Sequence, residues 1–370
     1  MVAWSCSKTS SESEEEPLRT YYVGMDVHQA SIVIVVLNGA GKVVMESIVE
    51  TGVETVRSFV KQLRGRVYVT FEEGTQATWL YDVMRPLVSE VLVCNPRHNK
   101  LLLTGNKGDR MDARKLAELL RNGMLRAVYH GHQGLRLLKE LVRNYECLTA
   151  DTTRVKNRLK AIFRARAIAC VGHDVYRHDR RQHWLEKLSE PGAKVRAGFL
   201  YEQLAAMRRL RQEAKQAMLK EARQHPAYQL LLSIPLLGPI SVAEIIAVIE
   251  TPFRFRSKRQ FWTYSGLAVV TRTSAEYLVV NGVVRRSSRP ATTRGLNHNH
   301  NHLLKKVFKN AASGACMRGP FKPAYDLRVT QGMDPSLARL VIARKIAATT
   351  LTIWKRSQKF APERMIRQVA

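Results

Sequence analysis

Four acidic residues lie where predicted secondary structure begins or ends, and their oxygens could together hold a divalent cation. Asp26 ends the apolar run "YYVGMD", where an isolated aspartate is unfavourable in a strand. Glu72 ends "RVYVTFE", and Glu73 follows it directly. Asp109 and Asp112 open "GDRMDARKLAELLR" and share one face of a first helical turn. Converging carboxylates repel unless cations separate them, and hard oxygen ligands favour Mg²⁺ or Mn²⁺ in a two-metal phosphodiester site.

The pair Asp109 and Asp112 also has a structural interpretation. Asp109 fits the N-cap and Asp112 the third helical position, where free amides and the helix dipole stabilise acids. The spacing alone does not distinguish this role from a metal site. The expected convergence with Asp26 and Glu72 is what favours the metal site. Asp112 is the preferred ligand of the two, because Asp109 also fits a cap.

The segments around these acids predict an α/β domain. Three alternating apolar runs, "YYVGMDV", "SIVIVVL" and "KVVMESIVE", with the turn "NGAG" between the last two, indicate an antiparallel meander. Helical and apolar stretches then alternate, which predicts that the sheet continues in parallel. This is the order of the RNase H-like fold, although periodicity alone leaves other α/β folds open. Its first and fourth strands are neighbours, so Asp26 and Glu72 would converge at one edge, within reach of the helix bearing Asp109.

A helical pattern replaces the strand pattern at about Gly134. Apolar residues recur every three or four positions as far as Ile162, as in a coiled-coil seam. A second helix is expected over roughly residues 195–223, after a His/Arg-rich connector that contains Pro191 and Gly192. We expect a long helical hairpin that acts as a spacer or oligomer interface, with an apolar stripe that serves packing.

The segment after Pro226 predicts two helices joined by a tight turn. The run "LLLSIPLLGPISVAEIIAVIE" is long enough to suggest a membrane span, but its prolines, glycine and glutamate interrupt it. The turn "IPLLGP" is a helix-hairpin-helix signal, in which Gly238 lets a phosphate approach the amides of the next helix. A buried helical turn explains this pattern equally well.

The charge of the chain indicates its class of partner. Its 370 residues include 60 Lys and Arg against 31 Asp and Glu, a formal charge of +29, which predicts binding to a polyanion. Residues 251–310 hold twelve Lys or Arg, one acid and several aromatics, a composition suited to phosphate contacts around a packed platform. The expected nucleic-acid contacts are Gly238, Arg272, Arg285, Arg286, Arg294 and Lys305.

Other features narrow the class further. Five scattered cysteines form no C-x-x-C pair, so neither a zinc ribbon nor a disulfide framework is indicated. No signal-peptide pattern or uncharged run of bilayer length occurs, so we expect an intracellular protein without a membrane partner. The triple "HNHNH" (His298, His300, His302) would present three imidazoles on one side of an extended segment. We favour nucleic-acid contact or local capping over metal binding there.

Seven motifs carry a resemblance to a known family. They are "GMDVHQAS", "FEEGTQATWLYD", "NPRHNK", "GDRMDARKLAELLR", "IPLLGPISVAEII", "YSGLAVVTRTSAEY" and "TRGLNHNHNHLLKKVFKNAA". In order and spacing the chain resembles the DEDD insertion-sequence transposases, the serine-assisted, bridge-RNA-guided recombinases, from about Tyr21 to Ala348. The Ser/Glu-rich composition of residues 1–18 predicts a disordered acidic tail. The resemblance implies an RNase H-like, RuvC-like catalytic domain (19–133), a coiled-coil hairpin (134–225) and a C-terminal transposase domain (226–370).

The resemblance also implies the catalytic residues. Carried over by motif, the acids are Asp26, Glu72, Asp109 and Asp112, with Glu73 where the family often has a small residue. The family's serine nucleophile lies in a short Ser-Gly motif after a G-L-x-P-like segment, and "GLAVVTRTSAEY" places Ser274 there, with Ala275 in place of the glycine. Three other serines are close in sequence: Ser265, Ser287 and Ser288.

The function implied is transposition by DNA recombination. Ser274 would form a phosphoserine-DNA linkage, which conserves the energy of the broken bond, while the acids hold Mg²⁺ or Mn²⁺. The resemblance further implies a noncoding guide RNA as partner and assembly as a homodimer or homotetramer. It also implies a prokaryotic protein of the cytoplasm that associates with the nucleoid. Two alternatives remain open: a hydrolytic junction-resolving nuclease that uses the same acids with water, and a non-enzymatic nucleic-acid scaffold.

Overall fold

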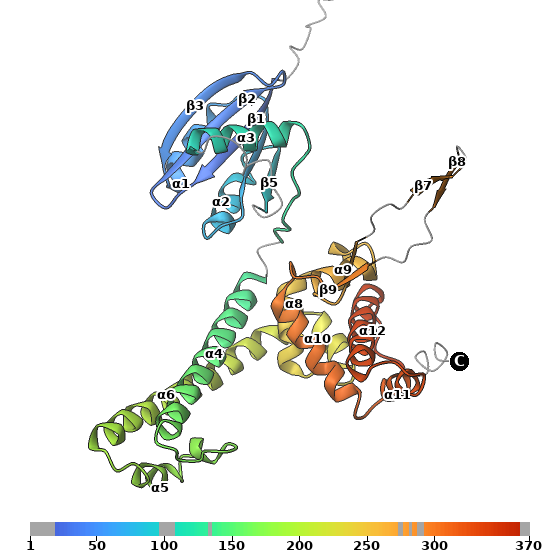
Figure 1. The fold of residues 1–370 in the computed structure, drawn as a ribbon. Coiled ribbons are helices and arrows are strands. Elements are labelled where there is room, and N and C mark those ends of the chain that lie inside the picture. The colour runs from blue at the N-terminus through green and yellow to red at the C-terminus, as the bar shows by residue number, and fades with distance from the viewer. Residues whose placement is uncertain are drawn as a thin grey trace, which may run out of the picture. The chain divides into compact units, whose positions relative to one another are not determined.

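The structure is a computed structural model that describes residues 19–95, 108–131, 135–272, 277–280, 283–286 and 292–362 (Figure 1). The chain divides into two compact units, Met1–His132 and Gln133–Ala370. The expected acidic tail and the motif "NPRHNK" beyond its asparagine lie outside the described residues.

A mixed five-stranded sheet forms the centre of the N-terminal unit. Its strands are β1 (Thr20–Val27), β2 (Ser31–Asn38), β3 (Val43–Glu50), β4 (Arg66–Glu72) and β5 (Glu90–Cys94). The order is β3-β2-β1-β4-β5, antiparallel from β3 to β1 and parallel from β1 to β5. The predicted meander and the adjacency of the first and fourth strands are confirmed, and the sheet is compatible with an RNase H-like fold.

Helices cover both faces of this sheet because its inner strands carry apolar side chains on both sides. On one face, α1 (Val53–Lys61) and α2 (Ala77–Met84) pack on a core that includes Val23 and Met25. On the other face lies α3 (Asp109–Arg121), which runs across the strands (Figure 1). The two sets of core residues alternate along the strands with the period of two that a pleated sheet requires.

Gly24 allows α3 to lie directly on the backbone of β1. A Cβ atom at Gly24 would come within 2.0 Å of the carbonyl oxygen of Ala113 and 2.6 Å of the amide nitrogen of Ala117. No side chain fits in that space, so this glycine sets the distance between helix and sheet. Asp109 precedes Ala113 by four residues, so the same helical face brings its first turn toward the end of β1.

Two long antiparallel helices begin the C-terminal unit. They are α4 (Arg136–Arg164) and α6 (Pro191–Ala222). Val142 near the start of α4 shares a core with Met218 near the end of α6, and Leu159 shares another with Ala197, which defines the antiparallel pairing. The predicted hairpin is present, and its supercoiling as a coiled coil stays a prediction.

The connector between these helices is shorter than the sequence predicts. Pro191 and Gly192 belong to the first turn of α6, because proline lacks only an amide that a first turn leaves unpaired anyway. The short helix α5 (Arg181–Glu186) lies within the connector. Its Trp184 donates a hydrogen bond of 3.0 Å from Nε1 to Oδ2 of Asp174.

The remainder of the C-terminal unit is mainly helical. Its helices are α7 (Ala227–Leu232), α8 (Pro239–Ile249), α9 (Lys258–Tyr264), α10 (His302–Ala315), α11 (Lys322–Thr330) and α12 (Pro335–Arg356). Two strand pairs join them: β6 (Val269–Arg272) with β9 (Thr292–Leu296), and β7 (Tyr277–Val280) with β8 (Val283–Arg286). The helices share a core that includes Phe261 and Phe308. None of the helices in the described part of the chain is long and apolar enough to span a membrane.

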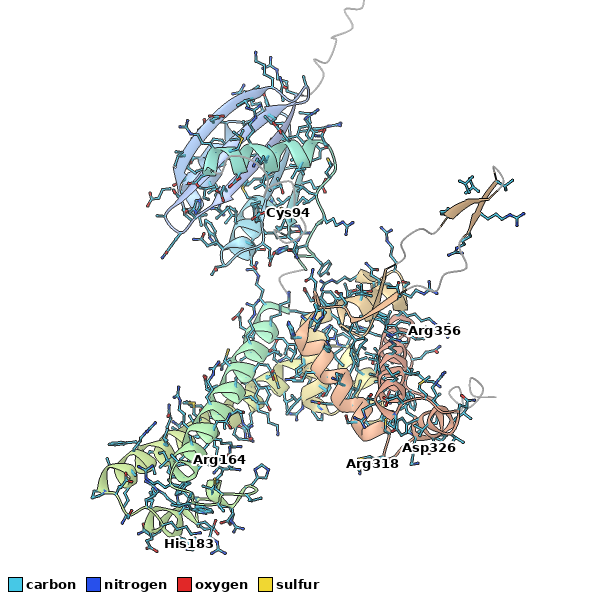
Figure 2. The ribbon with its side chains drawn as sticks, in the orientation of Figure 1. Cys94, Arg164, His183, Arg318, Asp326 and Arg356 are labelled. Atoms are coloured by element: carbon cyan, nitrogen blue, oxygen red, sulfur yellow. The ribbon has the colours of Figure 1, made fainter. Side chains whose placement is uncertain are left out.

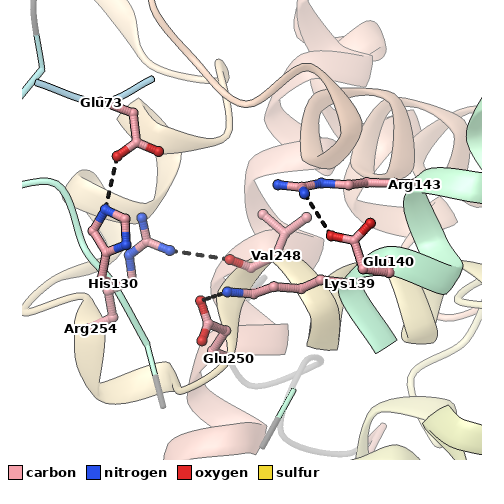
Figure 3. Close-up of polar contacts among 8 residues, drawn as sticks. All are labelled: Glu73, His130, Lys139, Glu140, Arg143, Val248, Glu250 and Arg254. Carbon is pink, nitrogen blue, oxygen red and sulfur yellow. Dashed lines mark hydrogen bonds and ion pairs between the residues drawn. The ribbon is translucent and has the colours of Figure 1, made fainter. Parts of the chain in front are cut away.

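Ion pairs to the buried side chains of Glu244 and Glu250 fasten α4 to this helical core. Lys139 on α4 lies 2.6 Å from Glu250, at the end of α8 (Figure 3). Lys306 on α10 contacts Glu146 of α4 at 2.6 Å and Glu244 of α8 at 3.3 Å. The hairpin is therefore attached to α8 and α10 by charge as well as by apolar packing.

Candidate active site

Asp26, His28 and Asp109 meet where the carboxyl end of β1 lies near the start of α3. His28 Nε2 lies 3.2 Å from Asp26 Oδ2 and 3.6 Å from Asp109 Oδ2. One ligand atom from each of the three lies within 4.8 Å of the others. Gly24 and Asp26 alternate along β1 and face α3, and His28 follows the strand directly and contacts both Asp26 and Asp109 on that side.

Asp112 adds a third carboxylate one helical turn further on. Among the described residues its Oδ1 is buried without a hydrogen-bond partner, and Lys115 Nζ lies 3.9 Å away. A buried carboxylate oxygen without a donor is costly unless something satisfies it. This oxygen is therefore open to a further ligand.

Asp109 is not the N-cap of α3, although both aspartates lie in its first turn, where the helix dipole favours acids. The helix begins at Asp109, and Gly108 occupies the N-cap with extended backbone. Asp112 follows one full turn later, and its amide bonds the carbonyl of Gly108 at 2.9 Å. The preference for Asp112 over Asp109 depended on Asp109 being a cap, so both remain candidate ligands.

The pKa of Asp26 is shifted by its burial and by the acids beside it. Burial raises the pKa of Asp26, and the charges of Asp109 and Asp112 raise it further, while the adjacent His28 lowers it. The charged form of Asp26 is thus disfavoured by its own site. A divalent cation among these carboxylates would reverse that sign, because it favours every ionised neighbour.

Glu72 lies one strand away, on the same row of the sheet. The parallel pairing of β1 and β4 runs to Met25 and Phe71, so Asp26 and Glu72 occupy the next positions on adjacent strands. Glu72 and His28 both line a cleft of about 600 Å³ at this edge.

Glu73 is engaged elsewhere. His130 Nε2 lies 2.9 Å from Glu73 Oε2 (Figure 3). The His130 ring also stacks on that of Tyr81, with 4.8 Å between the ring centres. The amide of Glu73 bonds the carbonyl of Cys94, which continues the ladder between β4 and β5. These contacts explain Glu73 as a structural residue and support Glu72 as the ligand.

His28 is the residue of this cluster that the sequence reasoning missed. Its signal is present in "GMDVHQ", because a histidine two residues after Asp26 on a strand faces the same side. The signal becomes useful only once α3 is known to lie on that side.

Of the four candidate serines, the structure describes Ser265 alone. Ser274 falls within residues 273–276, outside the described residues, as do Ser287 and Ser288. Ser265 is fully buried at the end of α9, and its hydroxyl has no hydrogen-bond partner among the described residues. A hydroxyl enclosed in the core has no access to DNA, which removes Ser265 from the alternatives.

The expected nucleic-acid contacts are only partly visible. Arg285 and Arg286 are exposed on β8, and Lys305 is half-buried on α10, whereas the side chains of Arg272 and Arg294 lie outside the description. Gly238 is the N-cap of α8 with ordinary extended backbone, and a Cβ there would meet nothing within 4 Å. The residue in this turn with a left-handed backbone is Leu236, with φ of 72°.

The histidine triple is built around a helix start. Asn301 caps α10 by accepting a hydrogen bond of 3.0 Å from the amide of Leu304. His300 packs on Gly266, whose φ of 65° and missing side chain make the room. Burial lowers the pKa of His300, and the charge of Lys305 lowers it further. Local capping is confirmed, with the asparagine rather than a histidine as the cap.

Two family models match the chain in the order of its two units. A DEDD transposase model of the IS110 type matches residues 23–165, which include all four predicted acids. A transposase model for the IS116/IS110/IS902 family matches residues 228–325, which include Ser274. No curated protein matches the chain closely enough to count as a relative. Together the two models cover more than half of the sequence, and the chain therefore belongs to the IS110 family of DEDD transposases.

Proposed function

We propose that this transposase cuts and rejoins DNA at the ends of an insertion sequence through a phosphoserine linkage at Ser274. In this proposal Asp26, Glu72, Asp109 and Asp112 hold Mg²⁺ or Mn²⁺. The observation that carries it is the meeting of Asp26 and Asp109 around a single histidine, with the orphaned oxygen of Asp112 one turn away.

The residues present fit a divalent cation. Carboxylate oxygens are the donors that Mg²⁺ and Mn²⁺ prefer, and Asp112 Oδ1 has an unused coordination position. His28 lies between two of the acids and is an acceptable ligand for Mn²⁺, although less so for Mg²⁺. When bound, the cation would stabilise negative charge on the phosphate oxygens as the phosphodiester is broken.

The protein's own groups have separate tasks in this scheme. Asp26 and Glu72 are fixed by adjacent strands and Asp109 and Asp112 by one helical turn, so the ligands are positioned by rigid elements. The Ser274 hydroxyl attacks phosphorus, its proton leaves, and the bond from phosphorus to one deoxyribose oxygen breaks. The phosphoserine ester keeps the energy of that bond, so strands rejoin without ATP.

The partners proposed are those that the charge permits. A formal charge of +29 supports binding to DNA and to a noncoding guide RNA at once. The Arg285 and Arg286 side chains are exposed on β8 and serve as phosphate contacts in this proposal, together with Gly238, Arg272, Arg294 and Lys305. Assembly as a homodimer or homotetramer through the helical hairpin is also proposed.

Hydrolysis is the second candidate function. A junction-resolving nuclease would use the same four acids with water as nucleophile and would not need Ser274. The observation that favours this alternative is the cleft lined by His28 and Glu72, which is large enough to admit water beside the acids.

The decisive experiment searches for a covalent adduct. Protein, Mg²⁺, element RNA and end-labelled DNA are incubated, denatured and separated by size. We expect a protein-DNA adduct that Ser274→Ala abolishes, that Asp26→Asn and Asp112→Asn abolish, and that the matched control Glu73→Gln retains. Cleavage without an adduct, with Ser274→Ala fully active, would establish hydrolysis instead.

A further inference from the structure

A basic pocket lies at the end of α12, within the C-terminal unit. It has a volume of about 270 Å³ and is lined by the cations Lys258, Lys345, Arg356 and Lys359 and by the hydroxyls of Thr349 and Thr352. Figure 2 shows Arg356 at this end of the helix. No carboxylate is among the residues that line it.

The four cations differ from their neighbours in having no anionic partner. None of them forms an ion pair with a carboxylate of the described residues, whereas Lys139, Lys306 and Lys322 all do. Burial lowers the pKa of Lys345, and the charge of Arg328 lowers it further. Four like charges around one hollow repel each other, so an anion in the hollow would be stabilised by all four.

The wall of the pocket is held in place by the core. Ser357 ends α12 in a left-handed conformation with φ of 50° and turns the chain back. Phe360 is then fixed by a hydrogen bond of 2.9 Å from its amide to Ser233 Oγ, and its ring packs 5.9 Å from that of Phe321. Lys359 lies between these fixed points, so its backbone is held at the rim of the pocket.

The helix dipole explains only part of this arrangement. Cations in the last turn of a helix stabilise its free carbonyls, which accounts for Arg356. Lys345 lies three turns earlier, and Lys258 belongs to another helix, where it lies 5.8 Å above the ring of Trp262. Neither lysine lies at the last turn of α12, so the helix dipole does not explain their positions.

We propose that this pocket binds a backbone phosphate of a nucleic-acid strand. The proposal rests on the proposed function only in taking nucleic acid as the partner. Lys and Arg donate charge-assisted hydrogen bonds to the non-bridging oxygens. The pocket would thus anchor the strand without reading its sequence, independently of the acidic site.

The test compares two charge-matched double variants. Lys345→Gln with Arg356→Gln removes two pocket cations, and Lys220→Gln with Arg223→Gln removes two exposed cations near the end of α6. Labelled DNA duplex and labelled RNA duplex are titrated at several salt concentrations. We expect the pocket variant to lose about tenfold in affinity and to lower the slope of log K against log[salt] by about one per lost phosphate contact. We expect the control to stay within about twofold.

Three results are read from this series. If the pocket variant loses affinity for DNA alone or for RNA alone, the pocket binds that nucleic acid. If it loses affinity for both, the pocket binds a phosphate of either. Equal losses for the pocket and control variants mean that only net charge matters, which overturns the proposal. Lys345→Arg keeps the charge and should restore binding, and the exposed Lys359→Gln should reproduce part of the loss if the double variant folds poorly.

A separate measurement uses the wild-type protein and inorganic phosphate. Phosphate should raise the melting temperature above that in chloride of equal ionic strength, and the Lys345→Gln, Arg356→Gln variant should lose this difference. An equal shift in both proteins would contradict the pocket. Both tests measure binding rather than catalysis. Their results therefore do not depend on the outcome of the adduct experiment with Ser274→Ala.

Discussion

The two units of this transposase hold acidic clusters with different partners. In the C-terminal unit, Glu146 and Glu244 share the ammonium of Lys306, at 2.6 and 3.3 Å. In the N-terminal unit, the residue between Asp26 and Asp109 is His28, which is half exposed. One cluster thus contains a lysine ammonium among its acids, and the other contains an imidazole.

The two clusters also differ in exposure. Glu244 is 3% exposed, and its lysine comes from a neighbouring helix, so the charges of Glu146, Glu244 and Lys306 join three helices. The Asp26 side chain is 26% exposed, and its neighbour His28 lines the cleft at the end of the sheet. The proposed metal site is thus the acidic cluster that contains no lysine or arginine and lies beside a cleft.

The largest expected effect is on cleavage by Asp26→Asn. Loss of one ligand removes several kcal/mol of charge stabilisation, so DNA cleavage should fall about a hundredfold or more. The melting temperature without metal should stay equal or rise, because burial and the neighbouring acids disfavour the charge of Asp26. Glu244→Gln is the control and should leave cleavage unchanged. If Asp26→Asn and Glu244→Gln reduced cleavage equally, the two acidic clusters would not have different roles.

Gly24→Ala tests how α3 is positioned. Its methyl group would lie 2.0 Å from the Ala113 carbonyl oxygen, so the helix must move. We expect a loss of about 3 kcal/mol in the free energy of unfolding, together with weaker metal binding. Gly39→Ala is the control, because a Cβ there meets nothing within 4 Å. Urea denaturation and Mn²⁺ titration measure the two effects, and a fully active, stable variant would show that α3 does not set the site.

Lys306→Met should destabilise the C-terminal unit without touching the acidic cluster. It leaves Glu146 and Glu244 together without their cation, which we expect to cost about 2 kcal/mol, less than a fully buried pair because Lys306 is partly exposed. Double replacement with Glu244→Gln should recover part of the loss. An unchanged urea midpoint would mean that solvent already screens these charges.

The smallest effect is a pH dependence of stability. Burial raises the pKa of Glu244 from 4.5 to about 7, against the lowering effect of Lys306 and with Glu146 adding to the rise. The folded state therefore holds a proton that the unfolded chain has lost, so this group contributes less stability as pH rises from about 4.5 to about 7. Unfolding followed over this range should show the slope, and Glu244→Gln should remove it. A slope that persists in the variant would assign it to another group.

Much of the N-terminal fold follows from the sequence. The period of two along β1 to β3 and the turn at "NGAG" predicted the meander, and the alternation of helices and strands predicted that β1 and β4 are neighbours. The convergence of Asp26 with the first turn of α3 followed from that topology. Local patterns were sufficient because each strand and helix here obeys its own periodicity.

The features that escaped prediction depend on contacts between distant segments. His28 becomes a member of the site only when Gly24 admits α3, and the burial of Ser265 depends on the helices that pack around α9. Gly108 caps α3 by backbone geometry rather than by side-chain chemistry, so Asp109 looked like the cap. The pocket at Arg356 is formed by segments nearly a hundred residues apart, which no local pattern records.

The most direct test of the central claim is Mn²⁺ binding, followed by electron paramagnetic resonance on the Ser274→Ala protein to prevent turnover. We predict saturable binding that Asp26→Asn and Asp112→Asn each weaken by about tenfold or more, whereas Glu244→Gln binds as the parent does. Equal affinity in the Asp112→Asn variant and its parent, or no saturable binding at all, would contradict the assignment of these acids as a metal site.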